Sequence, residues 1–279
     1  MERDEELARM GDALDAAAAG NGGVVVVSAP AGLGKTMLLE AAPSVAADGT
    51  RTLFARASEL EAGFAFGVVR QLLEPPVLAA PEAEHARLLE GAARHAAAVL
   101  ELDPGAAPGR DLHQTLHGLF WLLVNLSADV PVLVAVDDLQ WADEPSLRWL
   151  AYLVNRLEQL PIAVVATIRT DAGRRVELPS DAGELRREAV EAIHGLRAVR
   201  VEPRPLSAVA VGTVLGRSLG RASDAAFTEA CHRHTGGNPF LLTELARELA
   251  VQRVSPTGDN STARKPADRA AFAMGEWSE

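Results

Sequence analysis

Two groups of residues in this chain have the types and the spacing that phosphate and metal chemistry require. The first group lies in residues 29–36, which read A-P-A-G-L-G-K-T and follow a β-branched apolar run. Gly32 and Gly34 allow a tight turn in which successive backbone N–H groups point at a phosphate. Lys35 supplies a mobile positive charge for the outer phosphates, and the Thr36 hydroxyl can hold Mg²⁺. The strand and helix patterns on either side predict a phosphate-binding loop.

The loop departs from the usual pattern at its first position, where Ala29 stands in place of glycine. An alanine fits there if its backbone φ is below zero. The alternative is a glycine-containing turn between a strand and a helix that binds nothing. The residues predicted to contact a nucleotide are Pro30, Ala31, Gly32, Leu33, Gly34, Lys35, Thr36 and Met37.

The second group is an acidic pair at the end of another apolar run. The run covers residues 132–136 and is followed by Asp137 and Asp138. Beside a phosphate loop, a carboxylate at the tip of a neighbouring strand binds the Mg²⁺ that bridges the β- and γ-phosphates. We assign that role to Asp137, together with Thr36, and expect Asp138 to orient or deprotonate an attacking water. Taken alone, such a pair is more often a solvated turn or a helix cap; the loop upstream reverses that balance.

The acidic pair opens a longer segment that resembles a family signature. Residues 137–143 read D-D-L-Q-W-A-D. This resembles the signature of bacterial STAND ATPases, in which two aspartates precede a hydrophobic residue, Gln or His, and W-A-D. The strongest resemblance is to the nucleotide-binding domain of the large ATP-binding regulators of the LuxR type. Other segments agree in the same order: E-E-L at 5–7, F-A-F-G-V-V-R-Q-L at 64–72, A-T-I-R at 166–169 and T-G-G-N-P-F-L-L at 235–242.

The resemblance implies an AAA-like P-loop NTPase that binds ATP or ADP with Mg²⁺. It identifies Arg169, at the end of the sensor-1 strand, as a γ-phosphate sensor; the alternative is an ordinary strand-end charge. It also implies that the proline region of a helical lid, at Pro239, approaches the nucleotide. The same segment can be a simple helix start with Asn238 as cap. The family's sheet implies a central phosphate-loop strand beside both the acidic strand and the sensor strand.

The resemblance further implies a nucleotide-dependent switch with slow or partner-dependent hydrolysis. No arginine finger can be assigned, and Asp138 stands where many related motors carry the longer Glu. The family's regulators continue into helical repeats and a DNA-binding domain, so the expected partners are missing C-terminal regulatory and DNA-binding domains or another protein. The chain would then be an excerpt or a truncated product. The alternatives are a stand-alone AAA-like ATPase, a P-loop kinase and a degenerate scaffold that binds no nucleotide.

Composition and charge limit the other function classes. The net charge of −11 and pI of about 5.2 argue against direct nucleic-acid binding, which needs a basic face. No apolar run approaches the roughly 20 residues that span a bilayer. A single cysteine, Cys231, suits a reducing compartment, and the acidic start of the chain has no signal-peptide pattern. We therefore expect a cytoplasmic protein without membrane contact.

The apolar pattern alternates strands and helices, which predicts an α/β fold: a three-layer sandwich with a mostly parallel sheet. We expect a P-loop ATP-binding domain at 1–205, a small helical lid at 206–252 and a disordered, polar tail at 253–279. The expected strands are 24–28, 51–55, 132–136, 162–168 and 198–201, and the expected helices beyond the loop helix are 64–74, 81–101, 112–126 and 145–159.

Overall fold

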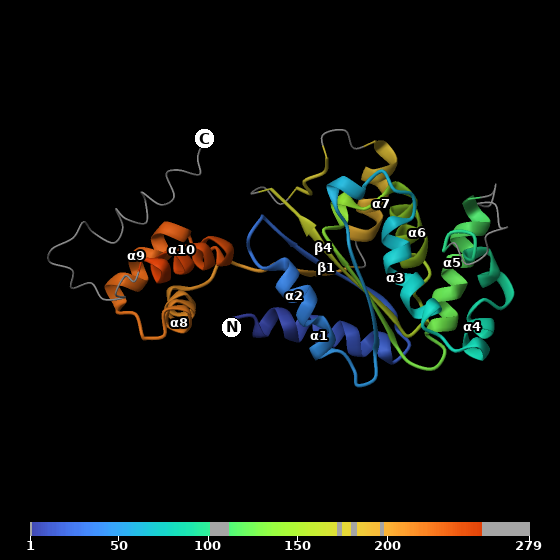
Figure 1. The fold of residues 1–279 in the computed structure, drawn as a ribbon, viewed down its shortest axis with the longest axis horizontal. Helices are drawn as coiled ribbons and strands as arrows, with labels where there is room; N and C mark the ends of the chain where they lie inside the picture. Colours follow the sequence, from blue (N-terminus) through green and yellow to red (C-terminus); the bar gives the residue numbers. More distant parts are fainter. Residues whose placement is uncertain (1, 101–111, 172–174, 180–182, 196–197, 253–279) are drawn as a thin grey trace. The chain divides into compact units, whose positions relative to one another are not determined.

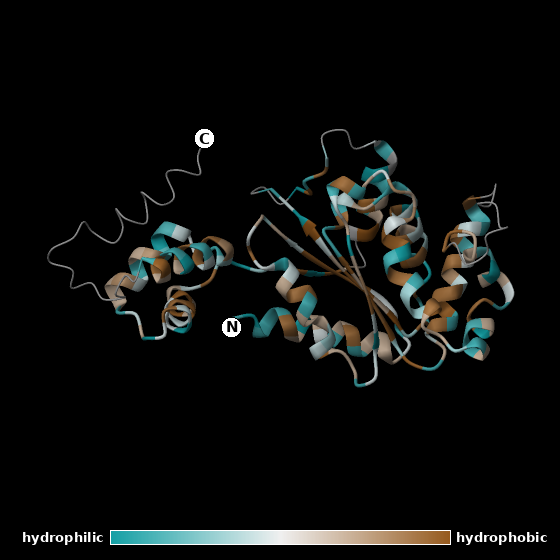
Figure 2. Cartoon of the chain, in the orientation of Figure 1, coloured by the Kyte–Doolittle hydropathy of each residue, from teal (hydrophilic) through white to brown (hydrophobic). Residues whose placement is uncertain are grey.

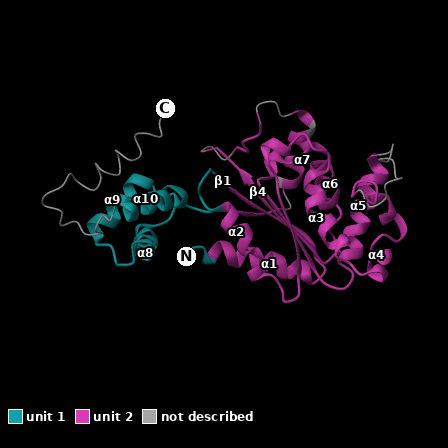
Figure 3. Cartoon of the chain, viewed as in Figure 1, with its two compact units in different colours: residues 1–4, 30–34, 203–279 teal, residues 5–29, 35–202 magenta. Residues whose placement is uncertain are grey.

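The computed structural model describes residues 2–100, 112–171, 175–179, 183–195 and 198–252 (Figure 1). The tail predicted at 253–279 lies outside the described residues. The chain divides into two compact units (Figure 3). The sheet unit comprises residues 5–29 and 35–202, and the helical unit comprises residues 1–4, 30–34 and 203–279.

The sheet unit is built on five parallel strands, which confirms the predicted α/β fold class. Their order across the sheet is β2-β3-β4-β1-β5. One expectation was wrong: β1, the phosphate-loop strand, pairs with β4 and β5, and the sensor strand β4 separates it from the acidic strand β3. The strands are β1 (Gly23–Ala29), β2 (Arg51–Arg56), β3 (Val132–Asp137), β4 (Ile162–Arg169) and β5 (Val199–Val201).

Both faces of the central strands are apolar, as the uninterrupted β-branched runs require. Alternate residues of β1 belong to two different cores: Val24 and Val26 face one, and Val25 and Val27 face the other. Figure 2 shows the hydrophobic strands between helices that carry polar outer faces. Since each core needs its own helical cover, the pattern produces the three layers.

Helices α1 (Asp4–Ala18) and α2 (Lys35–Ala41) cover one face of the sheet (Figure 1). The larger core lies on the other face, where the covering helices are α3 (Gly67–Leu78), α4 (Glu82–Leu88), α5 (Leu112–Leu126), α6 (Glu144–Val154) and α7 (Glu184–His194). Short 3₁₀ helices are η1 (Ala42–Val45), η2 (Glu59–Glu61), η3 (Gly91–Ala96) and η4 (Leu139–Trp141). Among the described residues, no helix combines the length and the apolar character needed to cross a membrane.

The helices differ from the sequence predictions in three places. The helix expected at 145–159 ends at Val154. The helix expected at 81–101 ends at Leu88 and is followed by η3, because Gly91 has a left-handed φ of 64° that an α-helix cannot continue through. Helix α7 was not predicted: it is largely polar, and the buried ones among its described side chains are Ala189, Val190 and Ile193. Its five apolar residues recur at helical spacing, so the sequence does carry a helical signal in this segment; they are Leu185, Ala189, Val190, Ala192 and Ile193.

The last aspartate of the D-D-L-Q-W-A-D segment holds two helix starts together. Asp143 caps α6 by accepting a hydrogen bond from Ser146 N–H at 2.9 Å. Its carboxylate also accepts from the backbone N–H groups of Phe66, at 2.8 Å, and Val68, at 3.2 Å. Phe66 has a φ of 60°, an uncommon conformation for a bulky residue. The F-A-F-G and W-A-D segments, about 75 residues apart, are therefore one structural element.

Replacing Asp143 with alanine should lower the free energy of unfolding of the sheet unit by about 3 kcal/mol, because three backbone donors lose a buried acceptor. Urea denaturation followed by tryptophan fluorescence would measure the loss. The matched control is Asp129→Ala, which removes an exposed carboxylate paired with Arg87 and should cost less than about 1 kcal/mol. Equal losses in the two variants would contradict the role given to Asp143.

The described part of the helical unit, up to residue 252, contains three helices around a small core of its own. They are α8 (Ala208–Leu219), α9 (Ala225–Thr235) and α10 (Pro239–Val251). Each begins with a side chain that accepts a backbone N–H: Ser207, Asp224 and Asn238. Asn238 with Pro239 at the first helical turn is the helix start expected from the sequence. The core includes Phe227 and Cys231, and burial raises the pKa of the Cys231 thiol to about 11.

Candidate functional site

The carboxyl ends of four strands meet at one edge of the sheet. In the parallel register, Ala29 at the end of β1 lies beside Arg169 of β4. Arg56 at the end of β2 lies beside Asp137 of β3. Open parallel sheets bind their ligands in the crevice outside this edge.

A buried carboxylate is the centre of this edge. Asp137 is 1% exposed and accepts hydrogen bonds from the Thr36 hydroxyl at 3.0 Å and the Thr167 hydroxyl at 2.7 Å. The Arg56 Nε donates to it at 3.2 Å, and the same guanidinium lies 3.8 Å from Glu40. Thr36 and Asp137, predicted to share one metal ion, are thus in direct contact although they are 101 residues apart.

This donor set fits Mg²⁺. The ion prefers hard oxygen ligands, and Thr36 and Asp137 offer a hydroxyl and a carboxylate. The Thr36 hydroxyl donates its hydrogen bond to Asp137, which leaves the lone pairs of the hydroxyl oxygen available to a cation. Because Mg²⁺ keeps several waters and takes few protein ligands, two such residues with nucleotide phosphates are sufficient.

Lys35 is held close to the end of β1. The residue is 8% exposed, and its ammonium donates to the Ala29 carbonyl at 2.9 Å. Burial lowers the pKa of Lys35, and the nearby charge of Asp138 acts in the opposite direction. A phosphate group would favour the charged ammonium, since an opposite charge at short range stabilises it. Ala29 is not among the residues with positive φ, so the alanine at this position meets the condition set by the sequence.

The remaining loop residues, 30–34, belong to the helical unit. Gly32 and Gly34 have φ values of 79° and 86°, so both need the conformational freedom of glycine. A Cβ on Gly32 would lie 2.6 Å from Asn238 Oδ1. Asn238 Nδ2 donates to the Ala31 carbonyl at 3.2 Å, and Phe240 N–H donates to the Gly32 carbonyl at 3.2 Å. The first turn of α10 is therefore hydrogen-bonded to the backbone of loop residues 31 and 32.

The other predicted contact residues differ in exposure. Leu33 is buried, and its carbonyl accepts from Arg3 at 3.2 Å. Pro30 is exposed and Met37 is 56% exposed. Pro239 is half-buried and stands between the two α10 residues that bond to the loop. Its predicted approach to a nucleotide stays a prediction.

Asp138 and Arg169, the two residues predicted to be catalytic, are connected through hydrogen bonds to Gln140. Asp138 has a left-handed φ of 53°, and its backbone N–H donates to the Thr167 hydroxyl at 2.8 Å. Gln140 Nε2 donates to Asp138 Oδ1, and Gln140 Oε1 accepts from Arg169 N–H, both at 3.1 Å. The Arg169 guanidinium pairs with Glu177 at 3.0 Å. A γ-phosphate would have to compete with that carboxylate, and exposed pairs of this kind are weak.

Sequence reasoning did not assign the contacts of four residues: Thr167, Gln140 and Arg56 in the sheet unit, and Asn238 in the helical unit. Thr167 and Gln140 stand inside segments that carry the family resemblance, so their positions were marked but their roles were not. Asn238 was identified as a helix cap, which leaves its bond to the loop unforeseen. Arg56 directly follows a predicted strand, and nothing in its neighbours signals a contact 81 residues away.

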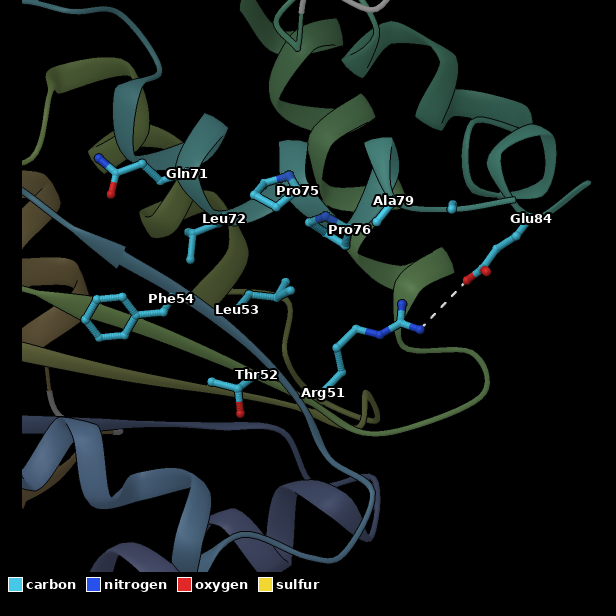
Figure 4. Close-up of a pocket in the computed structure, with 11 residues that line it drawn as sticks. Arg51, Thr52, Leu53, Phe54, Gln71, Leu72, Pro75, Pro76, Ala79 and Glu84 are labelled. Atoms are coloured by element: carbon cyan, nitrogen blue, oxygen red, sulfur yellow. Dashed lines mark ion pairs between the residues drawn. The ribbon is translucent and has the colours of Figure 1, made fainter. Parts of the chain in front are cut away.

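A hollow of about 480 Å³ lies elsewhere on the sheet unit, between the edge strand β2 and α3 (Figure 4). Thr52 and Phe54 of β2 face Pro75 of α3 across it, and the ion pair of Arg51 and Glu84 closes one end. None of the predicted site residues lines this hollow. It is therefore distinct from the phosphate loop.

Comparison with known proteins supports the same fold. The sequence model of a family described as "AAA ATPase domain" matches residues 1–165. Comparison with curated protein sequences gave no match.

Two solved structures share the fold at low sequence identity. The Walker-type ATPase of Pyrococcus abyssi is 17% identical with a TM-score of 0.57, over 99% of this chain and 74% of that one. Cdc6p from Pyrobaculum aerophilum is 13% identical with a TM-score of 0.53, over 90% of this chain and 62% of that one. At these identities the likeness concerns the fold alone.

Proposed function

Because this chain belongs to the AAA ATPase domain family, we propose that it is a nucleotide-dependent switch module of the STAND type that binds ATP with Mg²⁺ and hydrolyses it slowly. The observation that carries the proposal is the bonded group around Asp137, where hydroxyls from α2 and β4 meet one buried carboxylate. Such a group at the carboxyl edge of a parallel sheet suits a metal-bound polyphosphate. The STAND type rests on the resemblance of residues 64–72, 137–143 and 235–242.

Each residue of the edge has a separate task in this proposal. Lys35 binds the outer phosphates, and Thr36 with Asp137 holds Mg²⁺, which neutralises charge on the β- and γ-phosphates when bound. Asp138 accepts the proton of the attacking water. Arg169 leaves Glu177 to contact the γ-phosphate. We expect slow hydrolysis because no arginine finger can be assigned among the described residues, and such a group contributes about 10³–10⁵ in rate where it operates.

The switch is carried by helices α8, α9 and α10. Asn238 and Phe240 bond to the carbonyls of Ala31 and Gly32, so the first turn of α10 contacts the same backbone that would surround the phosphates. A change in the loop on nucleotide binding alters these bonds directly. The ligand can shift the helices only by as much as it binds the two arrangements differently, and the γ-phosphate contact supplies that difference.

The proposed setting is the nucleotide-binding part of a LuxR-type transcriptional regulator. The partners would be C-terminal regulatory and DNA-binding domains or a separate protein that reads the position of the helices. The net charge of −11 argues against nucleic-acid binding by these residues, so DNA contact would come from other domains. A stand-alone AAA ATPase is the second candidate, favoured by the family match alone. Rapid phosphate release by the purified chain without a partner would select it.

Hydrogen exchange tests the switch. Amides of residues 207–250 should exchange more slowly with a non-hydrolysable ATP analogue than in the nucleotide-free chain, and differently again with ADP. The Arg169→Ala variant should erase the difference between the two nucleotides while leaving ADP binding largely intact, because ADP has no γ-phosphate. Identical exchange in all three states would reject the switch and leave a rigid nucleotide-binding domain.

A further inference from the structure

Gln140 connects the two groups to which we assign the chemistry. Its side chain lies in η4, two residues beyond Asp138, and is 1% exposed. The amide donates to one oxygen of the Asp138 carboxylate and accepts the backbone N–H of Arg169, each at 3.1 Å. The orientation of the amide is fixed by its partners, because a backbone N–H can only donate and a carboxylate can only accept.

The carboxylate of Asp138 needs such a partner. Its backbone occupies a left-handed conformation, with φ 53° and ψ 47°, that is uncommon outside glycine. Thr167 fixes that backbone through the Asp138 N–H. The side chain can still rotate, and Gln140 supplies a hydrogen bond to its Oδ1. With Oδ1 held, Oδ2 keeps one direction relative to the carboxyl edge of the sheet.

The turn that carries Gln140 is itself anchored. The Arg186 guanidinium of α7 donates to the backbone carbonyls of Gln140, at 2.9 Å, and Ala142, at 2.8 Å. Gln140 is thus a fixed support, because its backbone is bound to α7 and its amide is bound to the end of β4.

We propose that Gln140 is a positioning residue that orients the Asp138 carboxylate toward the attacking water. Its second hydrogen bond, to the Arg169 N–H, fixes the position of that carboxylate relative to the end of β4. The inference rests on the proposed function, since it assigns the support of a general base. A glutamine meets the requirement because one planar group must both donate and accept. Glutamate cannot donate when ionised, and leucine can do neither. Neutral histidine can do both, and this is the alternative that the resembling signature allows at this position.

The test compares three variants of Gln140 in the whole chain. Gln140→Leu should lower the single-turnover rate of ATP hydrolysis by about 10- to 100-fold, the size expected when a general base is misplaced. Its Kd for Mg²⁺-ADP should stay within about threefold of wild type, because Lys35, Thr36 and Asp137 are untouched. Gln140→Glu should behave like Gln140→Leu. Gln140→His should recover the rate to within about fivefold of wild type.

A purely structural role predicts a different pattern. The matched control is Asn125→Leu on α5. It removes an amide that donates a hydrogen bond to the Leu88 carbonyl of α4 at 3.0 Å. It should lower the unfolding temperature without changing the hydrolysis rate. The proposal is overturned if Gln140→Leu keeps the wild-type rate, if its rate and ADP affinity fall together, or if Gln140→His is as slow as Gln140→Leu while remaining folded. Wild-type chain that binds ATP without hydrolysing it would also overturn it, whereas absence of nucleotide binding in wild type rejects the proposed function instead.

Discussion

Replacement of Lys35 by alanine is expected to weaken ATP binding by about 100-fold, or about 2.7 kcal/mol. The residue is 8% exposed and positioned against the end of β1, so its charge is already partly desolvated before any phosphate arrives. A hydrogen bond to a charged group in such surroundings contributes more than a neutral one. Isothermal titration calorimetry with Mg²⁺-ATP would measure the change.

The control for Lys35→Ala is a variant with the same change in net charge. Arg148→Ala removes a cation that pairs with Glu144 one helical turn away on the surface of α6. Long-range charge effects of this kind are screened by salt, so its ATP affinity should stay close to that of wild type. Wild-type affinity in Lys35→Ala would reject the phosphate-loop assignment, because within the described residues Lys35 is the only lysine.

Replacement of Asp137 by asparagine is expected to remove most of the Mg²⁺ dependence of ATP binding. In wild type, chelation of Mg²⁺ should weaken ATP binding by at least about tenfold, and in the variant the ratio should approach one. The physical reason is the loss of the negative charge that receives the metal. The asparagine would also turn an NH₂ group toward donors from Thr36, Thr167 and Arg56, which loosens the whole group.

Asparagine variants of Asp129 and Asp138 are the comparisons for Asp137→Asn. Asp129→Asn makes the same chemical change at an exposed position and should preserve the Mg²⁺ dependence. Asp138→Asn should spare Mg²⁺-ATP binding and lower the hydrolysis rate. If Asp137→Asn and Asp138→Asn both kept full turnover, the acidic end of β3 would not belong to the site.

The sequence was sufficient for the parts of the fold that depend on local pattern. Apolar runs predicted the strands, most clearly for β1, β3 and β4, which are buried on both faces. The glycines at 32 and 34 predicted a tight turn, and both have positive φ in the structure. Asn238 and Pro239 predicted the start of α10, since a cap and a helix-starting proline are local signals. These features need only neighbouring residues to be recognised.

The parts that could not be predicted depend on contacts between distant residues. The strand order β2-β3-β4-β1-β5 is a property of the whole sheet, so nothing within β1 shows that β4 rather than β3 lies beside it. The bond of Arg56 to Asp137, 81 residues later, follows from the register of β2 and β3. Asp143 resembled part of a nucleotide signature, and its carboxylate instead holds the starts of α3 and α6.

The central claim is that this chain binds a magnesium nucleotide at the loop of residues 30–37, and titration of the wild-type chain with Mg²⁺-ATP tests it most directly. We predict one saturable site per chain with a Kd below about 100 μM, more favourable than about −5.5 kcal/mol. Binding should weaken on chelation of Mg²⁺. The absence of saturable binding up to about 1 mM nucleotide, near −4.1 kcal/mol, would contradict the account.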